Sequence, residues 1–288
     1  MLLACALAPP GARATYPGKN GRIATVYDQF DRGGGFDVSL RLLDRNGATK
    51  ARFSRCSRPD ESEDANGPCP YDPAFTPDGR TIAHTLGKRL ALQASTGGAP
   101  TILPPLTARD RDPYPSPNGR KLVFTGTVSG KSNLYTVNLD GTGLTRVTRA
   151  GGGSPSWSSR GEIAYVAGGK IWRMRPGGKR RYVAKGTRPD WSPSGSTIAY
   201  VLRGSVYRVR ARGGARRLLV HGDVLSVGFS PDGASIALGR LNSGDIGGPL
   251  LTARSRDGSG VRKVAGGGEL PIGSTWLRWG APAWQPLR

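Results

Sequence analysis

One short motif recurs along almost the whole chain, and it constrains the fold more than any other feature. It reads DPAFTPDGRTIAHT from Asp72, DPYPSPNGRKLVFT from Asp112 and RPDWSPSGSTIAYV from Arg188, with further copies from Ser154 and Ser226. An aromatic residue holds the same place in each copy, with spacings of 39, 43, 34 and 38 residues, at Phe75, Tyr114, Trp157, Trp191 and Phe229. A period of this size is typical of repeat architectures.

Each copy has the chemistry of a β-hairpin. The first strand ends at Ser-Pro or Thr-Pro, and a following Asp-Gly, Asn-Gly or Ser-Gly supplies turn residues that tolerate positive φ. A second, almost continuously apolar strand comes next (198–201 in one copy), then an alternating third (206–209) and a short fourth (217–219). No window shows a sustained helical period, so we predict an all-β chain of four-stranded units.

The two ends of the chain supply a sixth copy in two halves. The C-terminal APAWQPLR carries Trp284 at the aromatic position, and PGKNGRIATV from Pro17 matches the second half of the motif. A split copy lets the last strand complete the first sheet, so that no open edge remains. We therefore predict a six-bladed β-propeller over residues 15–288, closed by the C-terminal strand joining the N-terminal blade.

The motif resembles that of the TolB-type, WD-repeat-like β-propeller family, whose signature is Trp-Ser-Pro-Asp-Gly-x-x-Ile-Ala-Phe. It stands most completely at residues 191–195 and 229–233, and the resemblance covers essentially residues 17–288. The opening PGKNGRIA also looks like exported bacterial members of this group. The resemblance is specific for the fold, because the motif recurs six times, and it is much less specific for function.

The N-terminus and the cysteines predict export. Residues 2–8 are apolar, and the small residues of Ala12-Arg13-Ala14 suit a signal-peptidase site, so residues 1–14 are a candidate signal peptide and the protein is expected to be secreted or periplasmic. A lipid anchor through Cys5 is the less favoured alternative. Cys56 and Cys69 enclose 12 residues and are expected to form a disulfide in an oxidising compartment. No apolar run is long enough for a transmembrane segment.

Sequence motifs assign no catalytic residue, metal ligand or cofactor. There is no Gly-x-Ser-x-Gly elbow, no Cys/His cluster with zinc spacing and no Asp-rich calcium loop. We therefore predict a monomeric, non-catalytic binding module for a protein or an anionic cell-envelope polymer. The alternative is a propeller enzyme (a hydrolase, lyase or quinoprotein-like dehydrogenase) with its site in the central funnel, since this fold hosts many functions.

Polar residues at the start of the innermost strands are the first candidate site. These positions tend to lie at one mouth of a propeller channel, where convergent polar groups can hold a ligand. The candidates are Asp72, Asp112, Ser154, Arg188, Asp190 and Ser226.

A concentrated basic sector is the second candidate site. The net charge is +22, and residues 170–217 hold 14 basic side chains against a single acid, Asp190. Within this sector, alternate residues along two predicted third strands are arginines, namely Arg173 and Arg175, and Arg208, Arg210 and Arg212. Such a sector favours an acidic partner, although an arginine-rich composition would give the same pattern. Nucleic acid is not the expected partner, because aromatic residues do not interleave as base platforms.

Overall fold

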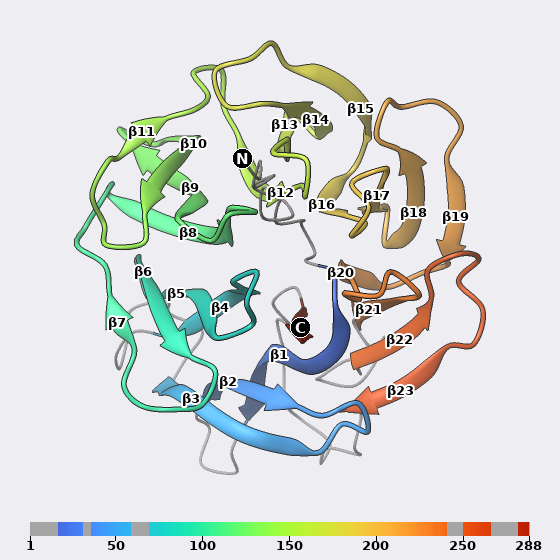
Figure 1. The fold of residues 1–288 in the computed structure, drawn as a ribbon, viewed down its shortest axis with the longest axis horizontal. Helices are drawn as coiled ribbons and strands as arrows, with labels where there is room; N and C mark the ends of the chain where they lie inside the picture. The colour runs from blue at the N-terminus through green and yellow to red at the C-terminus, as the bar shows by residue number, and fades with distance from the viewer. Residues whose placement is uncertain (1–16, 31–35, 59–68, 241–249, 266–281, 288) are drawn as a thin grey trace, which may run out of the picture.

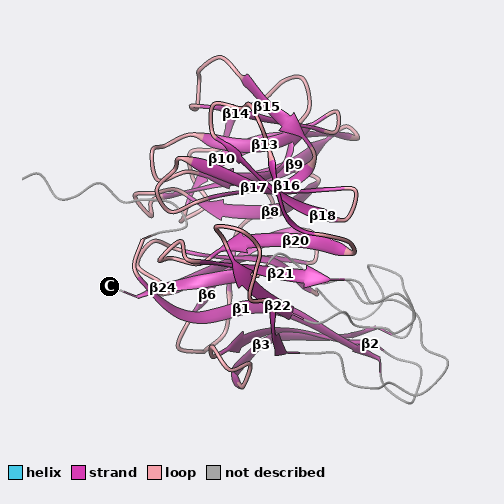
Figure 2. Cartoon of the chain, turned by 90° about the vertical axis from the view of Figure 1, so that its right-hand side faces the viewer, coloured by secondary structure: helices cyan, strands magenta, loops and turns pink. Residues whose placement is uncertain are grey.

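The computed structural model describes residues 17–30, 36–58, 69–240, 250–265 and 282–287, and every regular element among them is a β-strand. The strands form six four-stranded antiparallel sheets around a central axis, as Figure 1 shows. The described residues contain no helix of the length and apolarity needed to cross a bilayer, and Figure 2 shows only strands and loops among them. The predicted all-β, six-bladed β-propeller is therefore confirmed.

The blades are numbered 1 to 6 in chain order, and the strands of each are given from the axis outwards. Blade 1 consists of β24 (Ala283–Leu287), β1 (Lys19–Phe30), β2 (Phe36–Leu43) and β3 (Thr49–Arg58). Blade 2 consists of β4 (Pro70–Phe75), β5 (Thr81–Leu86), β6 (Arg89–Ala94) and β7 (Thr101–Ile102). Blade 3 consists of β8 (Arg109–Pro115), β9 (Lys121–Val128), β10 (Lys131–Asn138) and β11 (Thr145–Arg146).

The remaining three blades follow the same order. Blade 4 consists of β12 (Gly153–Trp157), β13 (Ile163–Ala167), β14 (Lys170–Met174) and β15 (Arg181–Lys185). Blade 5 consists of β16 (Thr187–Trp191), β17 (Thr197–Leu202), β18 (Ser205–Arg210) and β19 (Arg217–Val220). Blade 6 consists of β20 (Val224–Phe229), β21 (Ser235–Arg240), β22 (Leu250–Arg254) and β23 (Arg262–Ala265).

The ring closes through the predicted split copy of the motif. Strand β24 pairs antiparallel with β1, and Trp284 lies opposite Ile23 in the register. The C-terminal strand thereby becomes the innermost strand of the N-terminal blade. The two ends of the chain therefore share one sheet, and the ring of blades closes without an incomplete blade, as the sequence predicts.

The Ser-Pro-Asp-Gly turn explains why the first two strands of a blade pair tightly. In blade 6 the hydroxyl of Ser230 hydrogen-bonds to the Asp232 carboxylate at 2.6 Å and accepts from the backbone N–H of Ser235 at 2.9 Å. Gly233 has a φ of 72°, which the absence of a Cβ makes inexpensive. The turn therefore satisfies its own polar groups and fixes the register of the hairpin.

The second strands form the core. Ile82, Leu122, Ile163 and Ile198 have no exposed surface, because these strands are covered on both faces by neighbouring blades. The side chain of His84 lies in this layer, fully buried, with Nδ1 3.1 Å from the Thr85 carbonyl oxygen. Burial lowers the pKa of His84 to about 4, so the ring is neutral at physiological pH.

A disulfide joins Cys56 in β3 to Cys69, the residue before β4, and confirms the predicted pair. The bond joins the outermost strand of blade 1 to the residue that precedes the innermost strand of blade 2, across a Cα–Cα distance of 5.2 Å. Loop-entropy arithmetic gives about 3 kcal/mol of stabilisation for a loop of this size. The candidate signal peptide and Cys5 lie outside the described residues.

Candidate functional site

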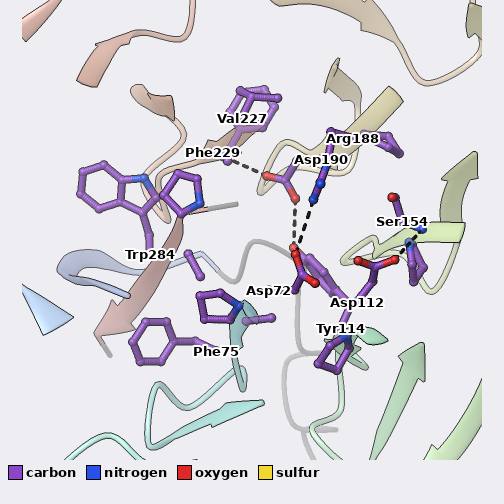
Figure 3. A pocket seen from close by; sticks show the side chains of 18 residues that line it. Asp72, Phe75, Asp112, Tyr114, Ser154, Arg188, Asp190, Val227, Phe229 and Trp284 are labelled. Carbon is purple, nitrogen blue, oxygen red and sulfur yellow. Dashed lines mark hydrogen bonds and ion pairs between the residues drawn. The ribbon is translucent and has the colours of Figure 1, made fainter. Parts of the chain in front are cut away.

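A cavity of about 100 Å³ lies on the propeller axis, where the innermost strands of all six blades converge (Figure 3). Blades 2 to 5 contribute its polar wall, which consists of Asp72, Asp112, Ser154, Arg188 and Asp190 together with Tyr114. Blades 6 and 1 contribute an apolar wall that includes Val227, Phe229 and Trp284. The cavity is thus divided into a polar arc and an apolar arc.

Four successive blades place the same unusual backbone conformation at the cavity. Asp72, Asp112, Ser154 and Arg188 have φ between 48° and 52°, in the left-handed region that residues other than glycine seldom adopt. Each precedes a proline, and in each strand the pairing with its neighbour shifts register at this point. The resulting bulge releases the residue from the ladder. Strained residues of this kind cluster at binding sites.

Asp72 lies between a second carboxylate and a cation. Nη1 of Arg188 donates to Oδ1 of Asp72 at 3.5 Å, a contact between blades that stand opposite each other in the ring. Burial and, less strongly, the neighbouring Asp112 carboxylate raise the pKa of Asp72 to about 7, although Arg188 opposes the shift. About a fifth of its side-chain surface (22%) is exposed, so a ligand in the cavity can reach it. This carboxyl group therefore titrates near neutral pH.

Asp190 connects four blades at the same level. Its Oδ1 accepts hydrogen bonds from the Tyr114 hydroxyl and the Ser156 hydroxyl, both at 3.1 Å, and its Oδ2 accepts from the backbone N–H of Phe229 at 2.8 Å. These donors belong to blades 3, 4 and 6, whereas Asp190 belongs to blade 5. The carboxylate is thus a structural tie as well as part of the cavity wall.

Asp112 plays a similar but smaller structural part. Its Oδ2 accepts from the Thr125 hydroxyl at 2.8 Å within blade 3 and from the backbone N–H of Ser154 at 3.2 Å in blade 4. The channel mouth therefore combines carboxylates that hold neighbouring blades together with one carboxylate, Asp72, whose charge is adjustable.

Five of the six predicted channel residues line the cavity, and Ser226 does not. Ser226 pairs with Gly239 in the ladder of blade 6 and is 1% exposed. Three residues that the sequence predicts only as repeat anchors also line the cavity, namely Tyr114, Phe229 and Trp284. Their position at the end of the innermost strand is the signal that would have found them.

The predicted arginine sector divides into paired and exposed side chains. Arg173 forms an ion pair with Glu162, and Nη1 of Arg208 donates to the Ser255 carbonyl oxygen at 3.0 Å. Arg175, Arg210 and Arg212 are exposed. The five arginines alternate along the strands, but only three of them are exposed and the other two are held by contacts within the protein.

No metal site stands out in the part of the chain that the structure describes, where no three His, Cys, Asp or Glu side chains are grouped to hold an ion. The channel groups can nevertheless accept and donate hydrogen bonds, and Asp72 can exchange a proton near neutral pH. Arg188 adds a cation that suits a carboxylate or a carbonyl oxygen.

Comparison of the sequence with known proteins gives one short match. No family model matches the chain. Over 99 residues it is 30% identical to a protein TolB homolog from Chlorobium luteolum, a match that covers 31% of this chain. The match spans only 23% of that curated relative's length.

Comparison with solved structures covers far more of the chain. TolB from Acinetobacter baumannii is 22% identical with a TM-score of 0.66, covering 92% of this chain and 67% of that one. A chain of a nidogen/laminin complex is 14% identical with a TM-score of 0.65, covering 91% and 98%. An oligogalacturonate lyase in complex with manganese is 14% identical with a TM-score of 0.53, covering 85% and 78%. The predicted resemblance is confirmed, and the chain is a six-bladed propeller similar to those of TolB proteins.

Proposed function

We propose that the protein is an exported, non-catalytic binding module that holds a protein partner at the mouth of its central channel. The observation that carries this proposal is the ring of polar residues in blades 2 to 5, all held in the same left-handed conformation at the cavity. Such strain is retained where it positions groups for binding. The likeness to TolB proteins and to a propeller from a nidogen/laminin complex supports a partner that is a protein.

The two arcs of the cavity define what the partner would present. Asp72 and Asp112 suit a hydrogen-bond donor or a cation, and Arg188 suits a carbonyl or carboxylate oxygen. The apolar arc of Val227, Phe229 and Trp284 suits an aliphatic or aromatic group. A cavity of about 100 Å³ accepts a side chain or two rather than a folded domain, so the remaining contact would spread over the rim.

The cellular compartment and the oligomeric state of the protein are part of the same proposal. The disulfide between Cys56 and Cys69 supports an oxidising compartment, since such bonds persist outside the cytosol. Residues 1–14 would act as a signal peptide that releases a monomer into the periplasm or the medium. Lipid anchoring through Cys5 is the alternative for the same export route.

The test is capture from a cell-envelope extract with the chain starting at Thr15. The channel variant Asp72→Asn/Arg188→Gln neutralises an ion pair in the cavity, and asparagine tolerates the left-handed backbone at position 72. The variant Asp223→Asn/Arg240→Gln is a matched control, because it neutralises an ion pair of 3.7 Å outside the cavity. The protein captured by the native chain should bind the channel variant about tenfold more weakly, a loss near 1.4 kcal/mol, and the control normally. Equal binding to both variants would refute the proposal.

One observation favours an enzyme as the second candidate. A carboxyl group with a pKa of about 7 beside an arginine is suited to proton transfer on an anionic substrate. The similar fold of an oligogalacturonate lyase points to uronate polymers as the first substrate to try. Release of unsaturated product by the native chain, lost in Asp72→Asn, would establish this candidate against the first.

A further inference from the structure

A second hollow, of about 490 Å³, lies between blades 4 and 5, away from the channel residues. We call it the inter-blade groove. Its walls are residues 182–185 of β15 and the turn 212–216 that joins β18 to β19, with Tyr200 of β17 between them. Strands β15 and β19 are the outermost strands of their blades, as Figure 1 shows. The groove therefore opens at the periphery of the ring.

Backbone geometry rather than side-chain pairing shapes this groove. Gly213 has a φ of 85°, and a Cβ at this position would lie 3.3 Å from the carbonyl oxygen of Val183. The turn of blade 5 thus approaches the outer strand of blade 4 closely because residue 213 has no side chain. The side chains on either side remain available for a ligand.

Three of the side chains that line the groove are cations. Lys185, Arg212 and Arg216 are exposed, and none of them forms an ion pair within the described ranges. The one acid of residues 170–217, Asp190, is buried in the channel and engaged by donors from three blades. The positive potential at the groove is therefore not neutralised by these neighbours, and it favours a negatively charged ligand.

Aromatic rings and a hydroxyl accompany these cations. Tyr182 is 49% exposed and meets Trp172 edge-on at 5.8 Å, which fixes its ring. The guanidinium of Arg216 lies 5.0 Å from the centre of the Tyr207 ring. A guanidinium held against a ring keeps its N–H edges available for a bidentate bond to an oxyanion. Tyr200 also lines the groove, with its hydroxyl buried beside Arg216; burial raises the pKa of this hydroxyl, and the nearby Arg216 guanidinium opposes the shift.

We propose that the inter-blade groove binds an acidic polysaccharide. A carboxylate or phosphate of the polymer would be held by Arg212 and Arg216, and a sugar ring would lie against Tyr182. The apolar face of a sugar ring can pack on the exposed ring of Tyr182, a contact that the charged side chains of an acidic peptide do not make. This site is separate from the channel, and the inference stands or falls independently of the proposed function.

The test measures binding of an oligogalacturonate to the full chain, by calorimetry at low salt. Arg212→Gln/Arg216→Gln should weaken binding about tenfold, and the fully methyl-esterified oligomer should not bind. The charge-matched control Arg120→Gln/Arg262→Gln removes two exposed arginines elsewhere and should change the affinity by less than twofold. The channel variant Asp72→Asn/Arg188→Gln should bind the oligomer normally, which separates this site from the channel.

Three further probes decide the class of ligand. A poly(glycerol phosphate) of equal charge carries phosphates but no sugar ring, so it should bind at least tenfold more weakly than the oligogalacturonate, and equal affinity would overturn the proposal. Polyglutamate and a single-stranded oligonucleotide of equal charge should bind at least tenfold more weakly than the oligogalacturonate. Equal losses in the groove and control variants, or tighter binding of the peptide or oligonucleotide, would overturn the proposal.

Discussion

The channel mouth and the inter-blade groove carry opposite charge and are built by different means. In a chain of net charge +22, the channel gathers three carboxylates, Asp72, Asp112 and Asp190, around one arginine. Asp112 and Asp190 also accept hydrogen bonds that join neighbouring blades. The cations of the groove are exposed and lack ion pairs within the described ranges, and a backbone approach at Gly213 shapes the groove.

Burial explains this difference. Six strands converge at the axis, so a polar side chain there loses water and must find partners inside the protein. At the outer strands side chains remain hydrated, and charges can accumulate without structural partners. We therefore expect substitutions in the channel to change stability as well as binding, and substitutions in the groove to change binding alone.

The largest expected effect is on stability at the channel. Asp190→Ala leaves donors of Tyr114, Ser156 and Phe229 without their acceptor, and we expect a loss of about 3 kcal/mol in the free energy of unfolding. Asp140→Ala is the control: Asp140 is exposed and accepts only within its own turn, so its replacement should cost much less stability than Asp190→Ala. Denaturant unfolding measures both, and Asp190→Asn should fall between native and alanine. Similar values for the two alanine variants would remove the distinction between the regions.

A smaller effect is a change in the pH dependence of stability. The pKa of Asp72 is raised to about 7 from an ordinary value of 3.8, so the folded chain keeps a proton that the unfolded chain releases between these values. The stability that this proton provides is complete below pH 3.8 and is lost as the pH rises to about 7. Asp72→Asn should therefore be more stable than the native chain at pH 8, with a gap that shrinks towards pH 4.

Melting temperatures across this pH range test the prediction. His84 also titrates differently on unfolding, because its pKa is lowered to about 4, and it favours stability as the pH rises from about 4 to 6.5. Both proteins contain His84, so the difference between their melting temperatures isolates Asp72. A gap that does not vary with pH would show that the Asp72 carboxyl is ionised in the folded chain throughout.

The smallest expected effect is on stability at the groove. Arg212→Gln/Arg216→Gln removes no ion pair. It removes the contacts of the Arg216 guanidinium with the Tyr207 ring and the Tyr200 hydroxyl, so the free energy of unfolding should stay within about 0.5 kcal/mol of native. The same unfolding experiment measures it. A loss as large as that of Asp190→Ala would mean that the groove cations are structural.

The repeat motif was sufficient to predict the fold and its closure. The aromatic anchors fixed the number of blades, and the split motif placed Trp284 beside Ile23, as the pairing of β24 with β1 confirms. These features are local in the sequence or follow from the periodicity, which is why one sequence was enough.

The candidate site could be predicted only in part. Asp72 precedes a proline and stands at a bulge, whereas Ser226 at the equivalent place precedes valine, stays in the ladder opposite Gly239 and does not line the cavity. Position in the repeat was therefore insufficient without the proline. The groove could not be predicted, because it forms where Tyr182 and Arg216, more than thirty residues apart, meet between two blades.

A crossed binding experiment tests the central claim, that one propeller carries two independent sites of opposite charge, most directly. The affinities of the captured protein partner and of the oligogalacturonate are measured for the channel and groove double variants. The account predicts that the channel variant binds the protein partner weakly and the oligogalacturonate normally. The groove variant should bind the protein partner normally and the oligogalacturonate weakly. A variant that loses affinity for both ligands would contradict the account, and so would normal binding of both ligands by both variants.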